Sequence, residues 1–171
     1  MKREFKAPLL RESRFTFHIS EPAPNRFYAS RFTFYAMHVI EVAAGLVFRN
    51  GRLLITQRQP EAHLGGLWEF PGGKREPDET FEACLVRELR EELGIEIDVG
   101  ELVESLTHDY SEKSVQLKFF RCRWKQHEPQ PLGCADFRWV TAAELPTYAF
   151  PAADARLLGK LQTNSALWVD A

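Results

Sequence analysis

The segment from Thr80 to Gly94 constrains the fold of this chain most strongly, because its ends and its faces are marked in the sequence. Thr80 is a typical N-cap residue, Glu82 suits the first helical turn, and Gly94 suits the position just past the end. We therefore predict a helix from Thr80 to Leu93. One face of this helix is apolar, which predicts packing against a core, and consists of Leu85, Val86, Leu89 and Leu93.

Three carboxylates, Glu88, Glu91 and Glu92, lie beside that apolar face at spacings of i, i+3 and i+4. Like charges at these spacings cost about 0.2–0.5 kcal/mol per pair, and acids near a helix C-terminus oppose the helix dipole. A divalent cation removes this repulsion, and Mg²⁺ is typically held by one or two carboxylates and by substrate phosphate oxygens. We interpret the acids as metal ligands at the edge of a cleft. The open alternative is a solvated face on which Arg87 and Arg90 pair with them.

The composition favours one domain in a reducing compartment. The chain has 171 residues, 44% hydrophobic and 27% charged, and is long enough to bury a core without covalent cross-links. The cysteines, Cys84, Cys122 and Cys134, form no C-x-x-C pair and predict neither a disulfide framework nor a cysteine zinc site. A net charge of −2 argues against nucleic acid as a partner, and the longest apolar run, Val42 to Phe48, is too short to span a membrane. We expect a cytoplasmic protein.

The pattern around the predicted helix is typical of an α+β domain. The run His38–Phe48, the turn residues Asn50-Gly51 and the run Arg52–Arg58 predict a β-hairpin, followed by a loop over Gln59–Gly66. Four further strands and a second helix are predicted at Ile95–Val99, Leu102–Thr107, Val115–Trp124, Phe137–Val140 and, for the helix, Asp154–Leu161.

Residues 1–36 differ from the rest, because they hold seven Lys and Arg against three Glu and contain six of the thirteen phenylalanines. We expect a disordered extension or an added hairpin, since Arg14-Phe15-Thr16-Phe17 is echoed by Arg31-Phe32-Thr33-Phe34. An organelle leader and a segment that stacks on single-stranded nucleic acid remain open alternatives. We place the domain at 37–162 and a C-terminal tail at 163–171, in which Leu167 and Trp168 can pack.

The segment from Gly73 to Ile95 resembles the Nudix box, G-x5-E-x7-R-E-U-x-E-E-x-G-U with U apolar, at every position. The resemblance implies the Nudix fold, a mixed β-sheet sandwiched between α-helices (α/β/α). It also implies hydrolysis of nucleoside diphosphates linked to another group, with Mg²⁺ or Mn²⁺ as cofactor.

The resemblance carries over residue by residue within the box. It implies that Glu88, Glu91 and Glu92 are catalytic residues that hold the metal. It implies that the carbonyl of Gly72 is a further metal ligand. Structural roles are implied for Gly73, Glu79 and Arg87, the last two as an ion pair.

The flanking segments are similar to the MutT-type branch of the family, which cleans the nucleotide pool. This similarity implies a small-molecule nucleotide substrate, release of nucleoside monophosphate and pyrophosphate, and 8-oxo-dGTP as leading substrate, in a monomer or homodimer. The implied substrate-binding residues are Arg58, His63, Glu69, Phe70, Pro71, Gly72 and Asp154. Taken alone, Arg58, His63 and Phe70 fit equally a surface arginine, a hydrogen-bonded histidine and a core phenylalanine.

Two departures from the branch leave alternatives open. Asp154 stands where bacterial MutT-type enzymes commonly carry Asn, and an ionised Asp only accepts hydrogen bonds, which suits guanine-like or cytosine donors. A (d)CTP or modified-pyrimidine pyrophosphohydrolase is therefore an alternative, and so is Asp154 as a helix N-cap. Gly133-Cys134-Ala135 replaces a stretch in which several relatives carry a glutamate, so we assign no general base outside the box. A non-catalytic Nudix-fold module that reads a base in DNA is the alternative from another class.

Overall fold

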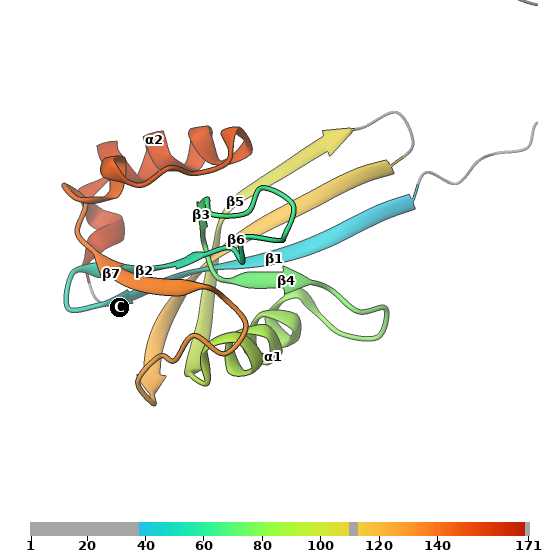
Figure 1. Cartoon of the computed structure of the whole chain (residues 1–171), viewed down its shortest axis with the longest axis horizontal. Helices are drawn as coiled ribbons and strands as arrows, with labels where there is room; N and C mark the ends of the chain where they lie inside the picture. The colour runs from blue at the N-terminus through green and yellow to red at the C-terminus, as the bar shows by residue number, and fades with distance from the viewer. Residues whose placement is uncertain (1–37, 110–112, 170–171) are drawn as a thin grey trace, which may run out of the picture. The chain divides into compact units, whose positions relative to one another are not determined.

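The computed structural model of the chain describes residues 38–109 and 113–169. The predicted extension at 1–36 lies outside these residues. The described part consists of one mixed sheet with a helix on either side, α1 below and α2 above in the view of Figure 1. The predicted α+β fold, a mixed sheet between helices, is therefore confirmed.

The sheet has the strand order β3-β2-β1-β6-β5, with β4 paired to β1 and β7 paired to β2. The strands are β1 (His38–Arg49), β2 (Arg52–Gln57), β3 (Trp68–Glu69), β4 (Gly72–Lys74), β5 (Glu96–Asp109), β6 (Lys113–Gln126) and β7 (Asp136–Val140). β1 runs parallel to β6, whereas the other pairs are antiparallel. The hairpin of β1 and β2 turns at Asn50 and Gly51, whose φ angles of 52° and 67° suit a two-residue turn.

Both faces of the sheet are buried, because apolar residues follow one another along the central strands. On β1, Ala43 and Val47 belong to the core cluster on the α1 side, and Leu46 and Phe48 belong to the cluster on the α2 side. This arrangement gives the continuous apolar runs seen in the sequence, since a strand covered on both faces has no polar side.

The two helices cover opposite faces of the sheet. Helix α1 (Phe81–Leu93) contributes Cys84, Leu85, Leu89 and Leu93 to one core cluster, and α2 (Ala155–Thr163) contributes Leu157 and Leu161 to the other. Three short 3₁₀ turns are η1 (Leu145–Thr147), η2 (Ala152–Asp154) and η3 (Ser165–Trp168). No helix of residues 38–109 and 113–169 is long and apolar enough to cross a membrane.

Some elements differ in detail from those expected from the sequence. The two strands expected at Ile95–Val99 and Leu102–Thr107 are one strand, β5, which stays paired with β6 through register shifts around Leu102. The strands β3 and β4 were not predicted, because two or three residues show no periodicity and form a strand only by pairing. Helix α2 begins at Ala155, since η2 precedes it. In the C-terminal tail, Leu167 and Trp168 pack as expected, because η3 buries both in the core cluster on the α2 side.

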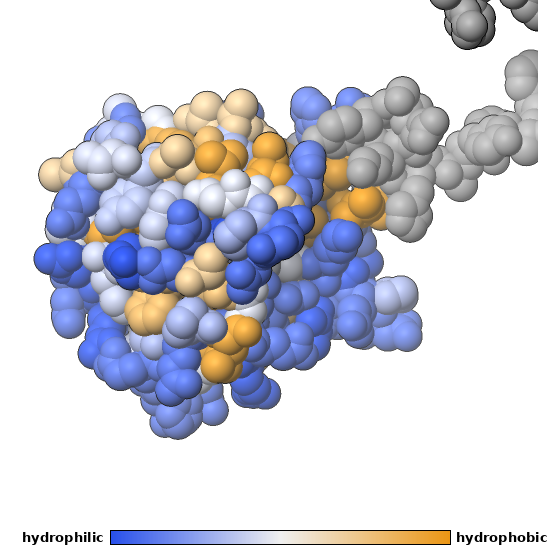
Figure 2. All heavy atoms as spheres, viewed as in Figure 1, coloured by the Kyte–Doolittle hydropathy of each residue, from blue (hydrophilic) through white to orange (hydrophobic). Residues whose placement is uncertain are grey.

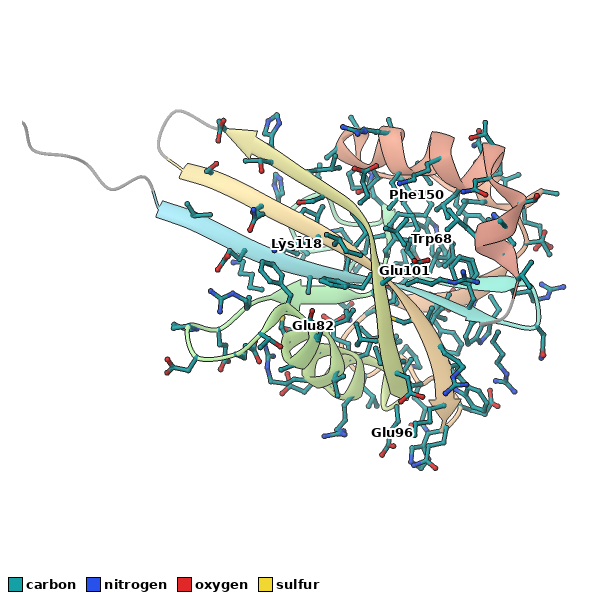
Figure 3. The ribbon with its side chains drawn as sticks, turned by 180° about the vertical axis from the view of Figure 1, so that it is seen from behind. Trp68, Glu82, Glu96, Glu101, Lys118 and Phe150 are labelled. Atoms are coloured by element: carbon teal, nitrogen blue, oxygen red, sulfur yellow. The ribbon has the colours of Figure 1, made fainter. Side chains whose placement is uncertain are left out.

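Figure 2 shows that hydrophilic residues dominate the face in view and that hydrophobic residues gather between α2 and the β3 segment. Figure 3 views the molecule from behind and shows Trp68 and Phe150 together on the α2 side of the sheet. Glu82, at the start of α1, lies on the opposite side. The α2 side therefore offers aromatic surface, and α1 offers charge.

Candidate active site

Helix α1, which carries the acids, is capped at both ends. The Thr80 hydroxyl accepts a hydrogen bond from the Ala83 N–H at 3.1 Å. Gly94 adopts a left-handed conformation (φ 68°) and donates to the Arg90 carbonyl at 3.0 Å. These two caps fix both ends of α1. The packing of its apolar face on the sheet then determines the direction in which its acids point.

The acids on α1 differ in exposure. The side chain of Glu88 is 16% exposed and that of Glu91 is 60% exposed, while Glu92 is half-buried. Glu88 and Glu92 therefore face the molecule, and Glu91 lies at the rim. Burial and the nearby charges of Glu88 and Glu69 raise the pKa of Glu92 to about 7. The side chain of Glu92 makes no hydrogen bond or ion pair within the described residues, although its backbone carbonyl accepts from Leu132 and Gly133.

Arg87 connects α1 to the loop that precedes it. Its guanidinium donates to Glu79 at 2.6 and 3.1 Å and to the Lys74 carbonyl at 3.2 Å. These bonds lower the pKa of Glu79 to about 2 and raise the pKa of Arg87. The same guanidinium reaches Glu88 at 2.9 Å and Glu91 at 3.3 Å. The structure thus forms the Glu79–Arg87 pair and uses it to hold Glu88.

Gly72 and Gly73 let two parts of the fold approach closely. A Cβ on Gly73 would lie 2.2–2.5 Å from the carboxylate atoms of Glu88. A Cβ on Gly72 would lie 2.1 Å from the Ala43 carbonyl oxygen, where β4 pairs with β1, and its φ is 154°. Gly73 therefore makes room for the Glu88 side chain, and Gly72 makes room for the neighbouring strand.

A second group of polar residues lies near Glu92 and includes Arg58, Glu69 and Asp154. Arg58 donates to the Glu69 carboxylate and, through Nε, to the His63 carbonyl at 2.8 Å. Burial raises the pKa of Glu69 above its usual value, although Arg58 opposes this change. The His63 side chain is exposed, so in this structure His63 holds Arg58 through its backbone.

Asp154 is the most isolated acid of the group. It is 6% exposed, and its side chain makes no hydrogen bond within residues 38–109 and 113–169. Asp154 occupies the N-cap position of α2, as the alternative expected, but its side chain makes no capping hydrogen bond. Burial and the charge of Glu69 raise the pKa of Asp154 to about 6, and Arg58 opposes this rise. The Asp154 oxygens are not among the fully enclosed side-chain atoms that lack a partner, so they keep some contact with solvent and are available to a ligand.

The aromatic residues near this group pack on one another. Phe70 is 5% exposed and its ring centroid lies 5.8 Å from Phe119 and 5.1 Å from Phe150. In the structure Phe70 is thus a core residue that supports Phe150. Trp68 packs edge-on against Tyr148 at 4.9 Å. Pro71 is also buried, and its carbonyl accepts from the Gly45 N–H at 2.8 Å.

The chemistry of the acids fits a hard divalent cation. No three His, Cys, Asp or Glu side chains of the described residues converge into a ready metal cage, because Arg87 holds Glu88. The available donors are all oxygens, and the like charges around Glu92 are those that a cation neutralises. Glu88 can exchange its Arg87 contact for a metal without loss of the Glu79–Arg87 pair, since that pair uses other guanidinium atoms.

A hollow elsewhere on α1 is a poorer candidate site. An open groove of about 620 Å³ lies between α1 and β5 and is lined in part by Glu82, Arg90 and Asp98. Arg87 and Glu91 also line it. Neither Glu92 nor Asp154 lines it. The candidate site is therefore the region where Glu92 and Asp154 both lie near Arg58 and Glu69.

Comparison with known proteins identifies this arrangement. The model of the NUDIX domain matches residues 43–160, which include both the acids of α1 and Asp154. The chain belongs to the Nudix family. The chain is 42% identical over 127 residues to a CTP pyrophosphohydrolase of Escherichia coli K12, covering 71% of this chain and 90% of that protein. It is 32% identical over 127 residues to an 8-oxo-dGTP diphosphatase of the same organism, covering 74% and 98%.

Solved Nudix structures agree. The solution structure of the E. coli ORF135 protein superposes with a TM-score of 0.65 at 38% identity, covering 74% of this chain and 91% of that chain. A MutT structure described for Aliivibrio salmonicida and Vibrio cholerae gives 0.56 at 32% identity, covering 73% and 98%. The protein is a Nudix hydrolase that acts on phosphoanhydride bonds of nucleotides, as the sequence predicted.

Two structural features of this Nudix hydrolase were missed by sequence reasoning. Arg75 pairs with Glu41 and donates to the Glu79 carbonyl at 2.5 Å, so it fixes the loop between β4 and α1. The segment of residues 130–133 binds the end of α1, which no motif indicated. The unusual Gly133 was the only available signal for the second feature.

Proposed function

We propose that this Nudix hydrolase converts nucleoside triphosphates to monophosphates and pyrophosphate with Mg²⁺, for which Mn²⁺ can substitute. We propose 8-oxo-dGTP as its leading substrate. One observation carries the proposal. Two half-buried or buried acids without partners, Glu92 and Asp154, flank a single ion pair, Arg58–Glu69. The cation bound to a triphosphate would be the partner of Glu92, and the polar base of the nucleotide would be the partner of Asp154.

In this proposal, the phosphates and their cation bind at α1 and at β4, the strand before it. Glu88, Glu92 and the Gly72 carbonyl would hold the cation, with Glu91 at the rim, directly or through water. When bound, a divalent cation neutralises phosphate oxygens and lowers the pKa of an attacking water. The chain contributes orientation: Gly73 leaves space for Glu88, and Arg87 anchors the loop through Glu79.

The base end belongs to Asp154. A protonated carboxyl both donates and accepts a hydrogen bond, whereas the ionised form only accepts. The O6 acceptor and N7–H donor of 8-oxoguanine match the protonated form. Arg58, held by Glu69 and by the His63 carbonyl, lies close enough to influence both Glu92 and Asp154, and it suits a phosphate or sugar contact between them.

A second substrate class, (d)CTP and modified pyrimidine triphosphates, is favoured by two observations. The N4–H₂ donor of cytosine next to its N3 acceptor matches the protonated form of Asp154, and N4–H₂ alone matches the ionised form. The relative that is 42% identical is named a CTP pyrophosphohydrolase. We also propose that the protein is cytoplasmic and acts as a monomer or homodimer. The three cysteines of the described residues are buried and free, which fits a reducing compartment.

Pyrophosphate release tests the activity. Purified protein is incubated with ordinary, oxidised and methylated nucleoside triphosphates, with Mg²⁺ and with EDTA. We expect pyrophosphate and monophosphate only with the metal, and loss of at least about 100-fold in kcat for Glu92→Gln. Inactivity on every nucleotide, or a fully active Glu92→Gln variant, overturns the proposal. Competition between 8-oxo-dGTP, dCTP and 5-methyl-dCTP then ranks the bases by kcat/KM.

A further inference from the structure

The chain between β6 and β7 runs across the C-terminal end of α1. The Gln130 N–H donates to the Leu93 carbonyl at 2.9 Å. The N–H groups of Leu132 and Gly133 both donate to the Glu92 carbonyl at 3.0 Å. The last carbonyls of a helix normally lack partners and carry its negative end, so these donors offset the unfavourable position of the acids there.

This crossing segment is fixed at both ends. On the β6 side, Glu128 accepts two hydrogen bonds from Arg49 at 2.8 and 2.9 Å, and Pro129 is buried. On the β7 side, Cys134 is 6% exposed and the Ala135 N–H donates to the Gln57 carbonyl at 2.8 Å. The segment therefore cannot retreat from α1 without breaking contacts at either end.

Gly133 is the point at which this segment touches Glu92. A Cβ on Gly133 would lie 3.0 Å from Cγ, 3.1 Å from Cα and 3.2 Å from Cβ of Glu92, closer than ordinary contact. Gly133 has no positive φ, unlike Gly94, so an alanine there meets no backbone strain. Position 133 therefore needs a residue without a side chain because of the space beside Glu92, and not because of its backbone conformation.

We propose that Gly133 is a positioning residue, which packs against the stem of Glu92 and so fixes the place of the Glu92 carboxylate. This inference rests on the proposed function, because it takes Glu92 as a metal ligand. A Cβ at 133 must push the Glu92 stem or the segment by a few tenths of an ångström. Small displacements of a positioned ligand cost activity out of proportion to their size.

The test compares Gly133→Ala with Gly159→Ala. A Cβ on Gly159, in α2, meets nothing within 4 Å, so this matched control adds the same methyl group without a contact. We measure Mn²⁺ affinity of the nucleotide-free protein by electron paramagnetic resonance, together with kcat, KM and Tm. For Gly133→Ala we expect about 3–10-fold weaker Mn²⁺ binding and a similar fall in kcat, with KM within about twofold. Gly159→Ala should keep wild-type Mn²⁺ affinity, kcat and KM, and its Tm should stay or rise slightly because alanine suits a helix interior better than glycine.

Glu92→Gln shows whether the effect passes through Glu92. In that background, Gly133→Ala should leave the residual Mn²⁺ affinity unchanged. The inference is overturned if Gly133→Ala weakens Mn²⁺ binding further in the Glu92→Gln background, or if Gly133→Ala alone binds Mn²⁺ like the wild type. Neither result touches the proposed function as long as the wild type hydrolyses nucleotides. If the wild type itself hydrolyses no nucleotide, the proposed function is what fails. Should Gly133→Ala not fold, a crystal structure of the wild type with Mn²⁺ decides: a Glu92 stem that has left Gly133 to reach the metal overturns the inference, and a stem that remains supports it.

Discussion

Arg58 donates to the carboxylate of Glu69, and this one ion pair faces both acids of the candidate site that lack partners. The pair supplies one positive and one negative charge to a place that already holds two further acids. Burial and the negative charge of Glu69 outweigh the attraction of Arg58 at both Glu92 and Asp154, so the pKa values of these two acids are raised. The site is thus arranged for a ligand that brings positive charge and hydrogen-bond donors.

Asp154→Asn should raise stability at neutral pH. The folded-state pKa of Asp154 is about 6, against an ordinary 3.8, so between these values the folded state holds a proton that the unfolded chain has released. Stability contributed by this group is full below about pH 4, falls as pH rises and is lost above about pH 6. We expect Asn to be more stable than Asp by about 1–3 kcal/mol at pH 7.5 and to lose most of this advantage only near about pH 3.5. Urea denaturation of both proteins measures the difference, and a constant difference across this range contradicts it.

The same substitution should change the pH dependence of base choice. Asn always donates and accepts, whereas Asp154 changes from both roles to acceptor only as pH rises through about 6. We expect the ratio of kcat/KM for 8-oxo-dGTP to that for dCTP to vary between pH 5.5 and 8 in the wild type. In Asp154→Asn the ratio should be flat. Equal pH dependence of this ratio in the two proteins would remove Asp154 from base recognition.

Arg58→Gln and Glu69→Gln should be coupled. Arg58→Gln leaves the carboxylate of Glu69 half-buried without its cation, so we expect a loss of about 1–2 kcal/mol, reduced by the partial exposure of both groups. The double variant should recover most of this loss, because neither charge remains alone. Denaturation of the four proteins of this cycle at pH 7.5 gives the coupling, and strictly additive losses would show that the pair is not a unit.

Gly73→Ala and Gly72→Ala should separate activity from stability. The new Cβ at 73 meets the end of a flexible side chain, Glu88, whereas that at 72 meets the backbone of Ala43. We expect Gly73→Ala to fold with a Tm within a few degrees of wild type and to lose about 100-fold in kcat. Gly72→Ala should lower stability by more than about 2 kcal/mol. Circular dichroism melts and pyrophosphate release distinguish the two, and an active Gly73→Ala enzyme would contradict the role of Glu88.

Trp168→Ala should destabilise the domain although the residue lies near the end of the chain. The Trp168 ring packs edge-on against Phe48 at 5.5 Å, and its Nε1–H donates to the Leu161 carbonyl at 2.8 Å. We expect a loss of about 3–5 kcal/mol by urea denaturation. The neighbouring Val169 side chain is 64% exposed, so Val169→Ala is the matched control and should change stability by less than about 0.5 kcal/mol.

Local signals predicted the parts of the fold that local interactions determine. Asn50 and Gly51 specify the first hairpin, and Thr80 and Gly94 mark both ends of α1, because a turn or a cap needs only its own residues. The parallel pairing of β1 with β6 and the short β4 depend on partners far along the chain, and no pattern in the sequence specified them.

The candidate site divides in the same way. The spacing of Glu88 and Glu92 placed both on one face of a helix, which is a local property. That Asp154 lies near Glu69 and makes no cap, or that Gly133 touches Glu92, follows from the meeting of distant segments. Phe70 illustrates the limit, because its neighbours Phe119 and Phe150 decide that it belongs to the core.

The acids of α1 and the acid before α2 belong to layers on opposite faces of one sheet (Figure 1). On the proposed assignment, substitutions that repack the α2 layer would alter which nucleotide is accepted, while the acids of α1 that act on the anhydride stay unchanged. Such a division lets a lineage exchange substrates in single steps without passing through an inactive ancestor.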